Sequence, residues 1–214
     1  MERMKTIVIR FVMLLLSGVA IVTNGYSQGK KPPNIIFILA DDLGWSSLSC
    51  SMDPRNPGAK SDYHETPNLC RLLSQGMRFS RGYASAAICS PSRRSILFGQ
   101  TPARLGDDSF SGRYHPSIAK DRTLPQILKG IDSRYRTAHY GKWDMRAGFS
   151  PEDAGYDESD GDTGNKHGDL MTDKDDKWST HFVTEDPKRM FTLTSRAKNF
   201  MERQTRTGNP FYLQ

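Results

Sequence analysis

Residues 34–44 read NIIFILADDLG, an apolar stretch that ends at two adjacent carboxylates. The first seven, Asn34–Ala40, are nearly all apolar or β-branched, which is typical of a strand covered on both faces of a parallel sheet. The pattern stops at Asp41 and Asp42. Because open α/β sheets bind ligands beyond the carboxyl ends of their strands, this stretch predicts an α/β fold with a ligand site at the two aspartates.

Helical and strand patterns alternate along the rest of the chain. The segment TPNLCRLLSQG predicts a helix that begins at Pro67, carries its leucines on one face and has Gly76 as its C-cap. Further helices are expected at 91–97, 123–131 and 187–203, and strands at 77–83 and from 210 onward. Residues 135–143 predict a strand that runs into a loop. Residues 146–180 are rich in Gly and Asp and predict a long surface loop. This alternation predicts an α/β sandwich with a mainly parallel sheet.

The N-terminus predicts export. Basic residues precede an apolar run at 11–22, and the small residues Gly25 and Ser27 follow at the spacing of a signal-peptide cleavage site. We therefore interpret residues 1–27 as a signal peptide and 28–33 as a linker, and expect a secreted or periplasmic protein. The alternative is a membrane anchor, but a stable membrane span needs about 20 apolar residues, more than this run supplies.

The distribution of charge narrows the classes of partner. The formal net charge of +6 is spread along the chain without a long run of like charges, which argues against a nucleic-acid partner.

The chain has three cysteines, so at least one is unpaired or pairs outside this segment. Cys50 and Cys70 either form a disulfide or remain two separate thiols. One of the three cysteines therefore needs another explanation.

The segment CSPSRRSILFGQ, at 89–100, resembles the signature of the sulfatase family, which begins with Cys, any residue, Pro, a small residue and Arg. The matching positions are Cys89, Pro91, Ser92, Arg93, Leu97 and Gly99. Three further blocks resemble the family, at 34–44, 66–79 and 135–143. The resemblance implies an alkaline-phosphatase-like α/β sandwich with helices on both faces of a mainly parallel central sheet. Residues 34–214 would be its N-terminal catalytic domain, incomplete at the C-terminus.

The resemblance also implies a nucleophile. In sulfatases the signature Cys is oxidised to formylglycine (3-oxoalanine), whose aldehyde hydrates to a geminal diol. One hydroxyl attacks the sulfur of a sulfate ester and expels the alcohol, and deprotonation of the other ejects sulfate. Cys89 is then the precursor, and Arg93 holds the nucleophile and balances charge. The maturation partner is a formylglycine-generating enzyme or an anaerobic sulfatase-maturating enzyme, which reads Pro91 and Arg93.

Asp41 and Asp42 are candidate metal ligands. Adjacent carboxylates repel each other unless a cation is present, and hard oxygens suit Ca²⁺ or Mg²⁺. Two aspartates in a turn are otherwise an ordinary solvated turn. The resemblance implies ligation by Asp41, Asp42 and the modified Cys89, with Ca²⁺ preferred over Mg²⁺.

Lys142 resembles the family's lysine that contacts sulfate and the nucleophile. Many members have His two residues later, where this chain has Asp144. Asp144 could replace the imidazole as a base, or it could only hydrogen-bond Lys142. We expect Arg94 to lie on the surface and His139 to be a packed residue.

Two further histidines, His167 and His181, are weak candidates for the acid that protonates the leaving group, and neither aligns with the family. The remaining metal ligands of the family and a second sulfate-binding lysine are expected beyond Gln214, so we expect a truncated, partial or split sequence.

Three functions compete. The favoured one is hydrolysis of sulfate esters, with sulfated carbohydrate preferred over small aryl esters because of export and the Gly-rich loop. The second is hydrolysis of phosphate or phosphonate esters in the same superfamily. The third is an inactive remnant that binds sulfated glycans.

Overall fold

The computed structural model describes residues 31–107, 121–146, 148–164, 170–172, 180–182, 186 and 189–214. The predicted signal peptide at 1–27 and the first half of the predicted linker at 28–33 lie outside these residues. Among the helices of the described ranges, none is long and apolar enough to cross a membrane.

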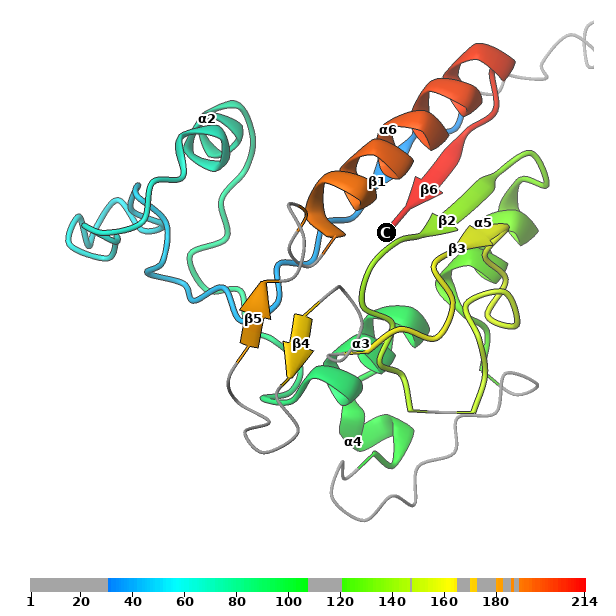
Figure 1. The fold of residues 1–214 in the computed structure, drawn as a ribbon, viewed down its shortest axis with the longest axis horizontal. Helices are drawn as coiled ribbons and strands as arrows, with labels where there is room; N and C mark the ends of the chain where they lie inside the picture. The colour runs from blue at the N-terminus through cyan, green and yellow to red at the C-terminus, as the bar shows by residue number, and fades with distance from the viewer. Residues whose placement is uncertain are drawn as a thin grey trace, which may run out of the picture. The chain divides into compact units, whose positions relative to one another are not determined.

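Four strands form a parallel sheet in the order β1-β6-β2-β3 (Figure 1). They are β1 (Ile35–Ile36), β6 (Phe211–Leu213), β2 (Arg136–His139) and β3 (Glu158–Ser159). Strand β6 lies between β1 and β2, so Tyr212 is in register with Ile35 on one side and Thr137 on the other. The prediction of a mainly parallel sheet is confirmed. A separate antiparallel pair joins β4 (Leu170–Thr172) to β5 (Thr180–Phe182).

Alternate residues of β6 point to opposite faces of the sheet and join two apolar clusters. Tyr212 belongs to the larger cluster, with side chains from α3 (Cys89–Phe98) and α5 (Leu124–Ile131). Phe211 and Leu213 pack with Phe200 of α6 (Met190–Thr207), the helix that runs along the sheet in Figure 1. Helices therefore cover both faces of the sheet, as predicted.

Helix α5 begins where the sequence predicts because Thr123 caps it. The Thr123 hydroxyl accepts a hydrogen bond from the Gln126 amide at 3.4 Å, and the Gln126 side chain accepts one from the Thr123 amide at 3.1 Å. This reciprocal pair is a capping box. The buried Thr123 hydroxyl also donates to the Ala154 carbonyl at 2.5 Å, which ties α5 to the segment before β3.

The predicted strand at 77–83 is wrong. These residues form turns and irregular backbone, and Met77, Phe79 and Tyr83 are 78%, 69% and 88% exposed. The preceding helix, α2 (Pro67–Gln75), forms as predicted but has no buried residue. Gly76 follows it with an extended backbone rather than a left-handed one. An apolar segment becomes a strand when a sheet edge pairs with it, and no described strand does so here.

The predicted strand at 34–40 is shorter than expected and covered less completely. Only Ile35 and Ile36 are in β1, although the Phe37 amide still donates to the Leu213 carbonyl at 2.7 Å. Ile36 and Ile38 are 51% and 81% exposed. The prediction of burial on both faces is wrong because, within the described part of the chain, β1 is an edge strand paired only with β6.

The prediction of one long loop at 146–180 is wrong in part. The segment before β3 buries Ala154 and Tyr156, and the Asp157 carboxylate accepts a hydrogen bond from the Thr137 amide at 2.8 Å. These contacts bring the following residues alongside β2, where they form β3. Strand β4 also falls within the predicted loop.

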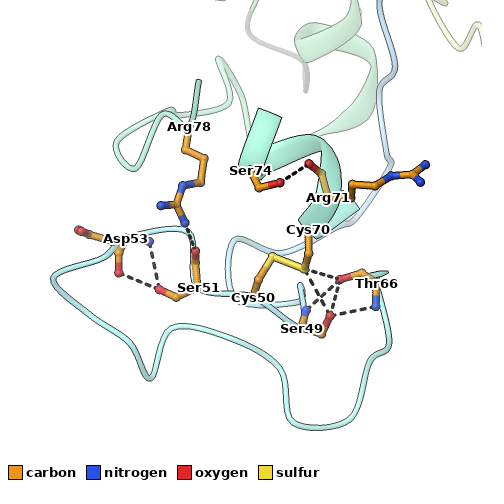
Figure 2. The surroundings of a disulfide bond; sticks show 9 residues. All are labelled: Ser49, Cys50, Ser51, Asp53, Thr66, Cys70, Arg71, Ser74 and Arg78. Carbon is orange, nitrogen blue, oxygen red and sulfur yellow. Dashed lines mark hydrogen bonds between the residues drawn. A yellow bond between two sulfur atoms is a disulfide. The ribbon is translucent and has the colours of Figure 1, made fainter. Parts of the chain in front are cut away.

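A disulfide joins Cys50 to Cys70 and decides between the two alternatives left open by the sequence (Figure 2). Around it the Ser49 amide donates to the Thr66 hydroxyl at 2.9 Å, and the Thr66 amide donates to the Ser49 hydroxyl at 3.1 Å. These bonds and the disulfide fix a turn-rich segment to the first turn of α2. Cys89 is left as the free cysteine of the chain.

Candidate active site

Parallel pairing brings together the segments that follow β1 and β2. Both strands end at the same edge of the sheet, so Asp41 and Lys142 meet although they are far apart in the chain. The Lys142 Nζ atom donates to Asp41 Oδ2 at 2.8 Å. Burial alone would lower the pKa of Lys142, but the hydrogen bond and charge of Asp41 outweigh it and raise that pKa.

Arg93 joins the same cluster from α3. Its side chain is 6% exposed, and its NH2 atom lies 3.4 Å from Asp41 Oδ1. The NH1 atom donates to the Lys142 carbonyl. Asp41 therefore faces two cations. Burial raises the pKa of Asp41, but the Lys142 hydrogen bond and the Arg93 charge outweigh it and lower that pKa.

Cys89 is the first residue of α3, at the end of the helix where the macrodipole favours negative charge. Its side chain interacts with both Lys142 and Asp144. The prediction that α3 begins just beyond Cys89 is accurate to within two residues. The structure therefore brings Cys89, Arg93, Lys142 and Asp41 to one place.

Asp144 completes the cluster from the segment that follows Lys142. Its Oδ1 atom accepts a hydrogen bond from Arg146 Nε at 3.2 Å. Its Oδ2 atom is buried, 3.7 Å from Lys142 Nζ, and has no hydrogen-bond partner among the described groups. Burial raises the pKa of Asp144, but Cys89, Arg146 and Lys142 outweigh it and lower that pKa. Asp144 is thus held as a carboxylate, beyond hydrogen-bonding distance of Lys142.

Asp42 is the one candidate residue that no described side chain contacts by a hydrogen bond or ion pair. It is exposed and has a positive φ of 58°. Asp41 and Asp42 offer the hard oxygens that Ca²⁺ and Mg²⁺ prefer, but these ions take six or more ligands. The described residues hold no group of three or more acidic, His or Cys side chains that could bind a metal. The two aspartates therefore fit a hard cation in chemistry and supply part of its ligand set.

The prediction that Arg94 lies on the surface is wrong. Its side chain is 6% exposed, and it pairs with Asp107 through Nε at 2.7 Å and NH2 at 2.9 Å. The NH1 atom donates to the Met145 carbonyl at 2.5 Å. Arg94 turns inward because it shares a helix face with buried Leu97 and Phe98, three and four residues later. This spacing was the signal in the sequence that could have identified it.

Among the histidines, His139 is packed as predicted. It is 2% exposed and lies edge-on to the rings of Trp143 and Tyr156. His181 lies on β5, opposite Met171, and His167 is outside the described residues.

Sequence reasoning also did not identify Thr163. Its carbonyl accepts hydrogen bonds from the amides of Trp143 at 2.9 Å and Asp144 at 2.8 Å. Its hydroxyl donates to the Gly141 carbonyl at 2.5 Å. Thr163 thus fixes the backbone that carries Lys142 and Asp144. A lone Thr in a polar segment gives no signal of this role in the sequence.

Comparison with known proteins gives consistent matches. A family model described as Sulfatase matches residues 33–214. N-acetylgalactosamine-6-sulfatase of Sus scrofa is 31% identical, over 94% of this chain and 42% of its own length. Arylsulfatase A of Homo sapiens is 35% identical, over 58% of this chain and 23% of its own length.

A solved structure supports the fold. The crystal structure of Ps i-CgsB is 24% identical and matches with a TM-score of 0.61, over 85% of this chain and 44% of that chain. This likeness and the parallel sheet confirm the predicted fold class. The chain spans less than half the length of each of these relatives.

Proposed function

The chain belongs to the sulfatase family, and from that membership we propose that it is the N-terminal part of an enzyme that hydrolyses sulfate esters. The observation that carries the proposal is the meeting of Cys89, Arg93, Lys142 and Asp41 at the carboxyl edge of the sheet. A sulfate ester is screened by negative oxygens, so its hydrolysis needs a strong nucleophile and cations around the sulfonate group. The cluster has a candidate for each part.

Cys89 is proposed as the precursor of the nucleophile. When oxidised to formylglycine it would supply a hydrated aldehyde, which can attack sulfur and later release sulfate. The position of Cys89 at the N-terminus of α3 favours negative charge on that residue. Conversion would require a formylglycine-generating enzyme or an anaerobic sulfatase-maturating enzyme as a partner. Export guided by residues 1–27 would make the protein secreted or periplasmic.

Lys142 and Arg93 are proposed to bind the sulfonate oxygens. Both are cations that already share the Asp41 carboxylate, so a bound anion would meet preorganised positive charge. The interaction of Asp144 with the Cys89 side chain supports a role for Asp144 as proton acceptor from that residue. Its lowered pKa keeps the carboxylate unprotonated.

Asp41 and Asp42 are proposed to hold a divalent cation, with Ca²⁺ preferred over Mg²⁺, together with the residue derived from Cys89. Such an ion would act as a Lewis acid toward a sulfate oxygen. Asp42 suits this role because its carboxylate is exposed and not engaged by any described side chain. Further ligands would have to come from outside the described residues.

A sulfated carbohydrate is the proposed substrate class. The relative from Sus scrofa, which aligns over most of this chain, is named for a sulfated amino sugar. Release of sulfate from sulfated N-acetylgalactosamine is therefore the first reaction to assay.

The test combines mass spectrometry with turnover. The complete enzyme, of which this chain is the N-terminal part, is expressed with and without a formylglycine-generating enzyme, and the peptide that contains Cys89 is weighed. We expect that peptide to be lighter by the difference between a thiol and an aldehyde, and sulfate release to rise in proportion to its conversion. Cys89→Ala should abolish release. An unmodified Cys89 in both preparations, or equal turnover by Cys89→Ala, would overturn the proposal. Faster cleavage of the matching phosphate ester would favour the second candidate function.

A further inference from the structure

We propose that Arg94 and Asp107 are positioning residues, whose buried ion pair holds the backbone of Lys142–Met145 in the geometry that the active site needs. The inference deepens the proposed function, because that segment carries Lys142 and Asp144. It assigns a task to an arginine that the family signature does not include and that helix geometry turns away from Cys89.

The pair is built as a rigid connection. Arg94 is 6% exposed and Asp107 is fully buried. Nε and NH2 of Arg94 bind the two oxygens of Asp107 at 2.7 and 2.9 Å, a bidentate contact that fixes the plane of the guanidinium. That orientation aims NH1 at the Met145 carbonyl, 2.5 Å away. A lysine has no planar fork and could not make these three bonds together.

Two consecutive arginines of α3 hold the two ends of the segment. Arg93 donates to the carbonyl of Lys142, and Arg94 donates to the carbonyl of Met145. The Thr163 carbonyl accepts hydrogen bonds from the amides of the two residues between them. The segment is therefore fixed to the helix that begins with Cys89, which sets the positions of Lys142 and Asp144 relative to Cys89.

The backbone conformation of Asp144 explains why such holding is needed. Asp144 has a φ of 47°, in the left-handed region that residues with side chains seldom occupy. A strained conformation of this kind persists only where its surroundings fix it. The Met145 carbonyl, which Arg94 holds, belongs to the residue that follows Asp144 directly. If Arg94 loses its orientation, Asp144 can relax and its carboxylate moves away from Cys89.

The alternative is that the ion pair only stabilises the fold. The two roles predict different effects on amide exchange in the segment Lys142–Met145 and on kcat. The test compares Arg94→Lys and Asp107→Asn with Phe200→Leu, a core substitution on the other face of the sheet from α3. All three should lower the melting temperature. Asp107→Asn keeps the side-chain shape, so it provides a readout if Arg94→Lys does not fold.

The first readout is hydrogen exchange at the amides of Trp143 and Asp144, which does not depend on turnover. We expect these amides to exchange at least about tenfold faster in Arg94→Lys and Asp107→Asn and to remain unchanged in Phe200→Leu, because only the first two release the segment. Unchanged exchange in both ion-pair variants, or equal acceleration in Phe200→Leu, would overturn the inference.

The second readout is kinetic. Conversion of Cys89 should be the same in all three variants, because residues 89–93 are untouched. For each converted site, kcat should fall roughly 10- to 100-fold in the ion-pair variants, with a smaller change in KM, because misplacement by about 1 Å costs this much. Faster exchange with kcat at the level of Phe200→Leu would overturn the positioning role. If the complete wild-type enzyme showed no turnover, the proposed function would be contradicted, and the exchange measurement would still decide whether the pair holds the segment.

Discussion

His139 allows a test of the packing at the end of β2, three residues before Lys142 of the candidate site, because its protonation state depends on burial. The residue is 2% exposed, and its ring centroid lies 5.0 Å from that of Trp143 and 5.5 Å from that of Tyr156. The Nδ1 atom has no hydrogen-bond partner among the described groups. Burial, together with the charge of Arg93, lowers the pKa of His139 to about 4. The fold therefore holds the neutral imidazole.

The pH dependence of stability follows from this difference. In the unfolded chain His139 takes up a proton below about pH 6.5, whereas the folded protein takes it up only near pH 4. Between these values the unfolded state binds more protons, so the free energy of unfolding falls as the pH is lowered. The contribution of His139 is complete above about pH 6.5. It should fall by about 2 kcal/mol between about pH 7 and pH 5, and by about 3 kcal/mol in all below pH 4.

Urea titrations at about pH 7 and pH 5 measure this loss, and most carboxylates remain ionised in that interval. We expect His139→Leu to remove about 2 kcal/mol of the difference between the two pH values. His64→Leu, at an exposed histidine, should leave the difference unchanged. An equal pH dependence in wild type and His139→Leu would show that the folded protein does not exclude the proton from this ring, and the argument from burial would be refuted.

Three further predictions test the site, a helix cap and the disulfide. Lys142→Met should reduce kcat/KM by about 10²-fold or more, because a cation near the sulfonate is lost. The control, Lys129→Met, should leave turnover within about threefold of wild type, and similar rates in both variants would contradict the proposed role of Lys142. In urea titrations, Thr123→Ala should lower the free energy of unfolding by about 2–4 kcal/mol, since it removes a helix cap and a buried hydrogen bond. The control, Thr101→Ala at the exposed cap of the short helix α4 (Pro102–Leu105), should lower it by less than about 1 kcal/mol. Cys50→Ser should lower the free energy of unfolding by about 3 kcal/mol, because the disulfide closes a loop with a sequence separation of 20. An unchanged urea midpoint would show that this loop does not constrain the unfolded chain.

The parts of the fold that the sequence predicts well are those with a local physical signal. Thr123 and Gln126 satisfy each other's amides, so the start of α5 is decided within four residues. The short apolar segment from 210 onward predicts strand β6, which lies between β1 and β2. The candidate cluster around Cys89 was predictable for a different reason. Parallel strands bring the residues that follow them to one edge of the sheet, so their side chains meet there.

Two of the wrong predictions concern segments whose structure is decided by distant partners. The apolar residues at 77–83 look like a strand, but no described strand pairs with them. The segment before β3 looks like a loop, yet Tyr156 is buried and the Asp157 carboxylate binds the backbone of β2. The local sequence predicts neither feature, because both depend on which surface the segment contacts after folding.

The geometry of α3 explains how adjacent arginines take different tasks. Successive residues of a helix point about 100° apart, so Arg93 faces Asp41 and Lys142 while Arg94 points into the core toward Asp107. Both nevertheless reach the segment that carries Lys142, and each does so by binding a main-chain carbonyl. Main-chain contacts fix that segment whatever its side chains are, so the charges are oriented before any ligand arrives. Preorganised charge of this kind costs no rearrangement when negative charge develops on a bound ester. Catalysis at this site should therefore depend on Arg94, which lies in the core, as well as on the residues that face the ester.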